Sequence, residues 1–312
     1  MPSVLSTLNP SALRTLGATI ATAFGIQAAC AAVCIPLQTE KFYDISGAVT
    51  FISCTLMSLY YPALRSKAPL PSILSFHPRQ LIMSGFTVLW ASRLGSFLYQ
   101  RIQRSGSDSR FDEIKKQPVS FAGAWFLQGV WVSLTALPVY AVNSIPASAQ
   151  PAMGRRDAIA AAMWVAAFGF EVVADRQKSA WREAREKKTH DEKFISSGAH
   201  TLPVFGFVDP GFGTDALSVV QDFGRFLVTP ISMWAAHFIA AQSTLSSPII
   251  AGRLFPVWMA YATVASPLLE YGLIRYVSGV PILEKTGDEK FGKDPKYVEY
   301  KKNTPVFFPK FW

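Results

Sequence analysis

The feature that most constrains this sequence is a series of apolar blocks. Each block is about 17–24 residues long and almost free of charge, which is the length that crosses a hydrocarbon core. Half of all residues are apolar, and 16% are charged, against about 25% in an ordinary soluble domain. A membrane span must satisfy its backbone polar groups internally, and Ala/Leu/Gly-rich blocks suit helices better than barrel strands. The sequence therefore predicts an all-α, polytopic membrane helical bundle of about seven transmembrane helices (range about six to eight). The expected spans lie near residues 16–37, 46–64, 80–100, 121–142, 158–174, 226–241 and 254–276.

The chain shows no internal repeat and no low-complexity linker, so we expect a single membrane domain over residues 1–312. Its three cysteines, Cys30, Cys34 and Cys54, fall within expected spans, and the four histidines show no ligand spacing. Small apolar packing residues are the simpler interpretation of the cysteines, so we predict no metal site. The sequence does not indicate an oligomeric state.

The distribution of lysine and arginine predicts the orientation of the chain. With seven spans, one side carries 21 of the 30 basic residues and the other side carries seven. We therefore expect a multi-pass integral membrane protein whose C-terminus and large basic loops, 101–120 and 176–197, face the cytosol. No nucleic-acid-binding motif accompanies the basic residues, so the bilayer and not a nucleic acid accounts for the net charge of +9.

Ionisable residues within an apolar block are costly and mark candidate sites. In the run FEVVADRQK, Glu171 and Asp175 are four residues apart and share one helix face at the end of the fifth expected span. Lys178 follows, and Arg182 lies one turn further on. A helix that simply leaves the membrane explains the basic residues, but it does not explain Glu171, which stands between Phe170 and Val172.

Two further clusters stand near expected span ends. In WASRLGSFLYQRIQRSGSDSRFDEIKK, Arg93 lies about two turns before the end of the third span, and Arg101 lies at its mouth. Arg93 needs a carboxylate, phosphate or carbonyl partner, for which Glu171, Asp175 or an anionic ligand would serve. In the tail, Tyr297, Tyr300 and Lys301 form either an amphipathic segment on anionic lipid or a cap over a phosphate-bearing cofactor.

Three motifs agree in order and spacing with one known family. The run from Arg93 to Phe111, the FEVVADRQK helix and the SGVPILEK…YKKNTPVFFP tail resemble uncharacterised membrane proteins related to steroid 5-alpha-reductases. The wider class includes sterol reductases and isoprenylcysteine methyltransferases. The resemblance covers roughly residues 45–198 and 245–309, and we take about 45–309 as the reductase-like core.

The resemblance implies a helical bundle with a cytosol-facing cavity that holds NADPH, in a protein of the endoplasmic reticulum. It also implies hydride transfer to an activated carbon–carbon double bond of a hydrophobic lipid or sterol-like substrate. Asp175 and Arg182 resemble cofactor-contacting positions, and the tail resembles the segment that encloses the nucleotide. No catalytic residue is identified. The cofactor-binding candidates are Glu171, Asp175, Lys178, Arg182, Tyr297, Tyr300 and Lys301, with Arg93 and Arg101 as further candidates.

The sequence departs from the family pattern in one segment, residues 198–226. There the family carries Arg-His-Pro-Asn-Tyr-Phe-Gly-Glu, a motif that supplies cofactor and active-site contacts, whereas this chain keeps only the Phe223–Gly224 pair. Its glycines do not fit a dinucleotide or P-loop fingerprint, because the neighbouring blocks are membrane helices. Two explanations remain, a protein that has become inactive or repurposed and an error in the coding sequence. The abrupt loss between matching flanks favours the second.

We expect an NADPH-dependent oxidoreductase acting on CH–CH groups, either active or inactive in this chain. One alternative is an enzyme that methylates a lipid or isoprenylcysteine with S-adenosylmethionine, and the tyrosines and lysines of the tail argue against it. The other alternative is a membrane scaffold without chemistry.

Overall fold

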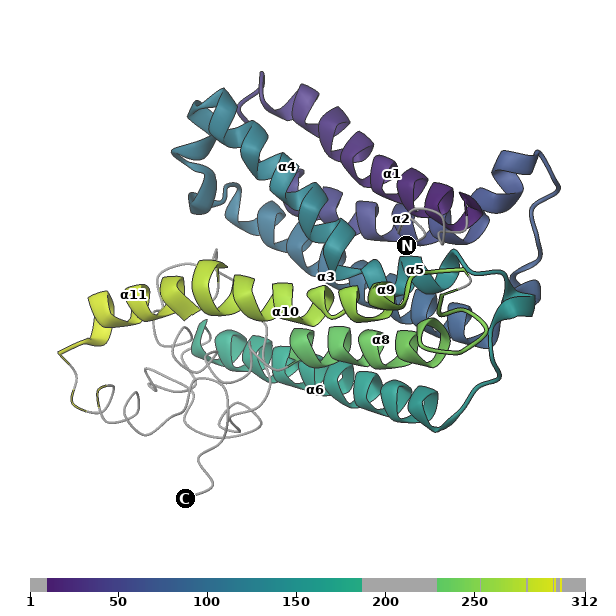
Figure 1. The fold of residues 1–312 in the computed structure, drawn as a ribbon. Coiled ribbons are helices and arrows are strands. Elements are labelled where there is room, and N and C mark those ends of the chain that lie inside the picture. Colours follow the sequence, from purple (N-terminus) through teal and green to yellow (C-terminus); the bar gives the residue numbers. More distant parts are fainter. Residues whose placement is uncertain are drawn as a thin grey trace. The chain divides into compact units, whose positions relative to one another are not determined.

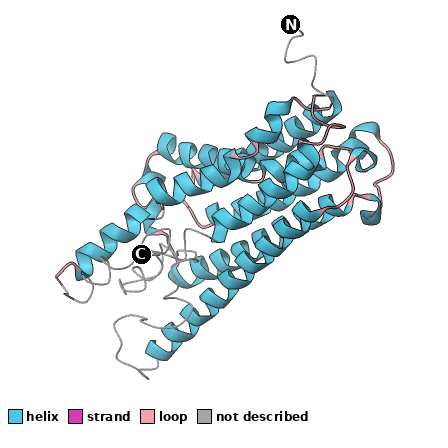
Figure 2. Cartoon of the chain, turned by 60° about the horizontal axis from the view of Figure 1, so that its bottom comes forward, coloured by secondary structure: helices cyan, strands magenta, loops and turns pink. Residues whose placement is uncertain are grey.

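The computed structural model describes residues 10–186, 229–252, 254–278 and 280–293, together with residues 295 and 298. Within these residues the regular elements are helices, and no strand is present (Figures 1 and 2). The longer helices are α1 (Pro10–Cys34), α2 (Tyr43–Ser66), α3 (Pro78–Ser105), α4 (Pro118–Thr135), α5 (Leu137–Asn143), α6 (Arg155–Glu186), α8 (Thr229–Leu245), α9 (Val257–Ala262), α10 (Ala265–Gly272) and α11 (Val280–Phe291). Short 3₁₀ turns include η3 (Ser109–Phe111) and η4 (Ile114–Lys116), and a π-helix, η6, covers Leu273–Ser278.

The chain groups into two compact units. The first comprises Met1–Ala161 and Ala235–Ser266, and the second comprises Ala162–Trp234 and Pro267–Trp312. In the first unit α2 packs against α1, α3, α4 and α5, so it is the central helix of this bundle. In the second unit α11 packs against η6.

Three described helices are long and apolar enough to cross a membrane: Ser11–Cys34, Tyr43–Ser66 and Pro78–Gln103. They coincide with the first three expected spans, and the mostly helical, membrane-type architecture is confirmed. The pair Pro118–Thr135 and Leu137–Asn143 counts as a fourth candidate only as a broken span. The described residues therefore give three or four candidate spans, and the full set of about seven stays a prediction.

The fourth expected span, 121–142, is helical but not straight, since α4 and α5 meet at an angle of 57°. Pro138 explains the break. It has no N–H to donate to the carbonyl four residues earlier, and its ring clashes with that turn. Ala136, the residue between the helices, instead closes the last turn of α4 by donating to Val132.

The last expected span, 254–276, is divided in the structure. α9 ends at Ala262, α10 begins at Ala265, and the π-helical turns of η6 follow. Pro267 near the start of α10 has no N–H for a continuous helix, which accounts for the interruption. A single long helix was the wrong expectation for this segment. The expected spans 158–174 and 226–241 fall largely on α6 and α8.

Glycines let the helices of the first unit approach closely. A Cβ added at Gly95 of α3 would lie 2.6 Å from the Cβ of Ala48 on α2. At Gly129 of α4 it would lie 2.9 Å from a ring carbon of Phe24 on α1. Small residues at such contacts are typical of membrane helices, which gain by close packing rather than by hydrophobic burial.

Candidate functional site

The first candidate site lies on α6 in the second unit. Glu171 is only 1% exposed, although its neighbours along the helix are apolar. The buried positions of α6 recur every three or four residues, at Ala160, Trp164, Ala167 and Glu171. The carboxylate therefore stands on the inner face of the helix.

The exposed side of α6 is apolar, with Ile159, Val165 and Val173 between 47% and 60% exposed. A helix that buries carboxylates and exposes branched aliphatic side chains is typical of a membrane environment, where ionisable groups face the protein interior. Asp175, four residues after Glu171, is half-buried and continues the inner face. Glu171 and Asp175, two of the predicted site residues, therefore lie on one face of α6.

The remaining predicted site residues are described in part or not at all. Lys178 and Arg182 lie on the helical backbone of α6, but their side chains are outside the described part. Tyr297, Tyr300 and Lys301 lie outside the described residues, as does the whole segment 198–226. The structure therefore brings Glu171 and Asp175 together and leaves the proposed cap of the tail a prediction.

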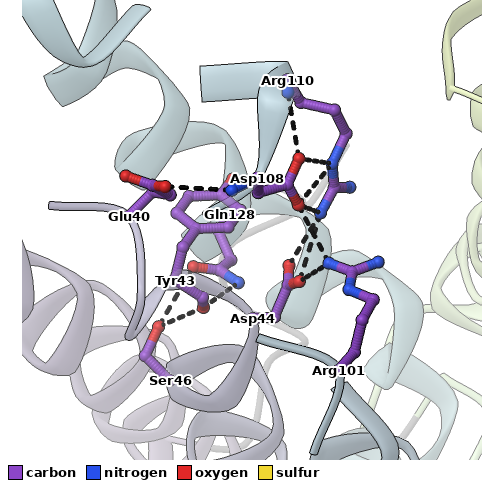
Figure 3. A network of polar contacts seen from close by, with 8 residues as sticks. All are labelled: Glu40, Tyr43, Asp44, Ser46, Arg101, Asp108, Arg110 and Gln128. Carbon is purple, nitrogen blue, oxygen red and sulfur yellow. Dashed lines mark hydrogen bonds and ion pairs between the residues drawn. The ribbon is translucent and has the colours of Figure 1, made fainter. Parts of the chain in front are cut away.

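Arg93 and Arg101, the further candidates, lie two turns apart on α3. Arg93 is half-buried. Arg101 is buried, and its guanidinium lies between two carboxylates of the protein (Figure 3). Its Nη2 donates to Asp44 at 2.5 Å and to Asp108 at 2.9 Å.

Arg101 belongs to a set of ionic contacts that we call the Asp44 network. It consists of Glu40, Asp44, Arg101, Asp108, Arg110 and Lys115. Arg110 donates through Nε and Nη2 to Asp108, and through Nη2 to Asp44 at 3.2 Å. The two arginines thus share the two aspartates, which joins the start of α2 to the end of α3 (Figure 3).

Local backbone geometry positions Asp108 for this role. α3 ends at Ser105, and the residue that caps it, Gly106, has a left-handed φ of 73° that suits a residue without a side chain. The chain then turns back, and Asp108 Oδ1 accepts the backbone N–H of Arg110. The sequence S-G-S-D-S-R therefore folds into a turn that points an aspartate at the last turns of the helix it follows.

Glu40, in the loop between α1 and α2, holds the other side of the turn. One of its oxygens accepts the Asp108 N–H at 3.0 Å, and the other accepts from Lys115 Nζ at 3.1 Å. The side chain of Glu40 is only 4% exposed. The loops 38–45 and 101–120 meet at one end of the bundle, in agreement with the alternation of spans that the sequence predicts.

The ionic contacts favour the charged forms of Asp108 and Lys115. Burial alone would raise the pKa of Asp108, but the hydrogen bonds and charges of Arg110 and Arg101 outweigh it and lower that pKa. The hydrogen bond to Glu40 raises the pKa of Lys115. Each cation of the Asp44 network thus contacts at least one carboxylate, and Lys115 also pairs with the more exposed Asp112 at 3.2 Å. Such an arrangement is suited to fixing a loop.

A second ionic site, which sequence reasoning missed, lies at the opposite end of α3. Arg79 donates to both oxygens of Asp157, at 2.6 and 2.9 Å, and both side chains are at most 3% exposed. The guanidinium also donates to Thr244 at 2.8 Å and to the carbonyls of Pro151 and Ala152. We call Arg79 and Asp157 the Arg79 pair.

The positions of the two ionic sites along α3 support its assignment as a span. Arg79 and Arg101 are 22 residues apart, or about 33 Å at 1.5 Å per residue. This is close to the thickness of about 30 Å of a hydrocarbon core. Charged groups thus stand at both ends of α3, each neutralised by carboxylates from other segments.

No group of three or more His, Cys, Asp or Glu side chains that could hold a metal ion is found in the part of the chain that the structure describes. Cys30, Cys34 and Cys54 are free thiols. Cys34 packs with Phe111, Phe121 and Trp125, in the packing role expected for it.

Of three comparisons with known proteins, one gives a match. No curated protein and no solved structure matches it. The model of a family described as "Protein of unknown function (DUF1295)" matches residues 32–201 and 232–304. The matched stretches cover most of the chain, and the unmatched interval between them overlaps most of the segment 198–226.

Proposed function

We propose that this chain, which belongs to the DUF1295 family, is a membrane-bound, NADPH-binding relative of the steroid 5-alpha-reductases. In this proposal the cofactor binds at the end of the inner face of α6, and its hydride reduces an activated carbon–carbon double bond of a lipid or sterol-like substrate. The protein resides in the endoplasmic reticulum membrane with its C-terminus in the cytosol.

The single observation that carries the proposal is the burial of Glu171. A carboxylate that is 1% exposed on a helix with an apolar outer face is costly to place there. Its position one turn before Asp175 makes a polar patch at the part of α6 where the motif resemblance places cofactor contacts.

The residue types on α6 fit the chemistry of a dinucleotide. Carboxylates only accept hydrogen bonds when ionised, so Asp175 and Glu171 suit ribose hydroxyls or an amide N–H. Lys178 and Arg182 follow within two turns and supply the positive charge that phosphates require. NADPH, when bound, would supply the hydride, and the chain's own task would be to orient it and exclude water.

The first test is a binding titration of the full chain in detergent with NADPH, NADH and S-adenosylmethionine. We expect NADPH to bind more tightly than NADH, because a 2′-phosphate adds a contact for the cations on α6. Asp175→Asn should weaken NADPH binding by about tenfold, which corresponds to about 1.4 kcal/mol. Failure of both nucleotides to bind would contradict the proposal.

A matched control separates this effect from a general loss of charge. Glu113→Gln removes a carboxylate whose side chain is 80% exposed and pairs with Lys116 at the surface. It should leave NADPH binding unchanged. Tight binding of S-adenosylmethionine in place of NADPH would favour the methyltransferase alternative.

The reduction step needs its own assay, because the chain lacks the Arg-His-Pro-Asn-Tyr-Phe-Gly-Glu motif. Enone lipids and sterols are added to the NADPH-loaded protein, and the loss of reduced nicotinamide is followed by absorbance. Oxidation that depends on substrate and on Asp175 supports an active enzyme. Nucleotide binding without oxidation supports the inactive form of the proposal.

A further inference from the structure

A buried polar row runs along α2 in the first unit, away from the α6 site. Ser46, Thr50, Cys54 and Ser58 are four residues apart in turn, and each is at most 5% exposed. Hydrogen bonds join this row to Gln27 of α1, Gln128 of α4 and Asn143 of α5. Inside a membrane-type bundle such a row is expected only if its polar atoms are satisfied.

Asn143, at the end of α5, has one side-chain atom that no described residue satisfies. It is 4% exposed, and its Nδ2 donates to Ser58 and to Ser84, both at 2.9 Å. Its Oδ1 is buried and has no hydrogen-bond partner among the described residues. A buried carbonyl oxygen left in this state costs about 1–3 kcal/mol.

Gln27 of α1 repeats the same arrangement two turns away along α2. It is 1% exposed, its Nε2 donates to Thr50 Oγ1 at 2.8 Å, and its Oε1 has no partner in the described part of the chain. Two side-chain amides from different helices thus each use the nitrogen against α2 and leave the oxygen unsatisfied.

Exchanging the oxygen and nitrogen of these amides does not remove the deficit. The hydroxyl of Ser58 donates to the carbonyl of Thr55 at 2.7 Å, and that of Thr50 donates to the carbonyl of Ser46 at 2.6 Å. Neither hydroxyl has a second proton, so each can only accept from the amide beside it. The hydroxyl directions therefore fix the amide nitrogens against α2.

We propose that the polar row of α2 is an internal water-binding site, with one ordered water donating to Asn143 Oδ1 and another to Gln27 Oε1. A small O–H donor is the ligand that this chemistry selects, because both unsatisfied atoms are acceptors. Water is the occupant that the burial favours, since both amides are at least 95% enclosed and a single water needs only about one probe sphere of space.

Hydroxyl-radical footprinting of the full chain in detergent tests this site. Internal waters generate radicals locally and label side chains that bulk solvent does not reach. Tyr140, one turn before Asn143 and only 1% exposed, is the reporter, and Phe255, an aromatic ring that is also 1% exposed, gives the background. We expect Tyr140 to be modified well above that background. Labelling of Tyr140 at the background rate would overturn the proposal.

Substitutions then connect the labelling to the unsatisfied oxygen. Asn143→Leu removes the acceptor, and the labelling of Tyr140 should be lost. Ser84→Ala removes only a partner of Nδ2, keeps Oδ1, and should retain the labelling. Equal labelling in wild type and Asn143→Leu would contradict the proposal.

If Asn143→Leu does not fold, a high-resolution experimental structure of the wild type decides the question. A water is expected at about 2.8 Å from Asn143 Oδ1. A lipid hydroxyl at that position, or no density there, would overturn the assignment.

Discussion

Each end of α3 carries a buried arginine, and the two arginines are neutralised in different ways. At its start, the Arg79 pair is enclosed, with both side chains at most 3% exposed and a bidentate contact between them. At its end, the Asp44 network spreads charge over six residues, and Arg110 and Asp44 remain 32% and 22% exposed. The loss of stability on breaking an ionic contact should therefore depend on how many opposite charges remain beside the group that is left.

Among the described residues, Arg79 has no second carboxylate to replace Asp157, whereas each aspartate of the Asp44 network contacts two arginines. Removing Asp157 leaves the buried Arg79 without a neutralising carboxylate. Removing one arginine of the Asp44 network leaves the other arginine in contact with both aspartates. We therefore expect a graded series of stabilities, which thermal unfolding in detergent can measure for each variant.

The largest effect is expected for Asp157→Ala. It leaves the Arg79 guanidinium buried without its carboxylate, which typically costs 3–5 kcal/mol. The double variant Arg79→Met/Asp157→Leu should be clearly more stable than Asp157→Ala, because it removes the stranded charge as well. A single variant as stable as wild type would show that the pair is not enclosed as described.

A smaller loss is expected for Arg101→Met, about 2 kcal/mol, because it leaves Asp44 and Asp108 facing each other with Arg110 alone. Arg110→Met should cost less, since the side chain that it removes is partly exposed. The order of the two melting temperatures is the decisive result. If Arg110→Met destabilised the protein more than Arg101→Met, the burial of Arg101 would not be the controlling factor.

The acid dependence of stability gives a third test, through Asp108. Arg110 and Arg101 lower the pKa of Asp108, so the ionised carboxylate is more stable in the folded protein than in the unfolded one. That contribution is present above the unfolded pKa of about 3.9 and is lost as the pH falls through the folded value. Asp108→Asn should be less stable at neutral pH and should lose less stability on acidification below about pH 4. Parallel pH curves for variant and wild type would contradict this assignment.

Much of the fold follows from the sequence, because length and apolarity are local properties. The first three spans are confirmed by helices that coincide with them. The break before Pro138 was missed because an average over apolar residues does not register one absent N–H. The interruption near Pro267 in the last expected span was missed for the same reason.

The ionic sites were harder to predict because their partners are distant in sequence. Arg101 stood out as a charge at the end of an apolar block, but Asp44 is 57 residues away from it. Arg79 and Asp157 are separated by 78 residues. One signal could have indicated such pairs. The loops alternate between two sides, so opposite charges in two loops of the same side are candidates for pairing.

The smallest effect is expected for Lys116→Ala, which removes an exposed contact close to the network. Lys116 donates to Glu113 at 2.8 Å, but the two side chains are 59% and 80% exposed. Solvent already stabilises both charges, so the change should lie within about 0.5 kcal/mol. Lys115→Met, one residue earlier, offers the matched comparison, since it leaves the buried carboxylate of Glu40 without its lysine and should cost about 1 kcal/mol. If the two variants melted at the same temperature, the burial of Glu40 would contribute nothing, and the distinction between enclosed and exposed partners would fail at this end of α3.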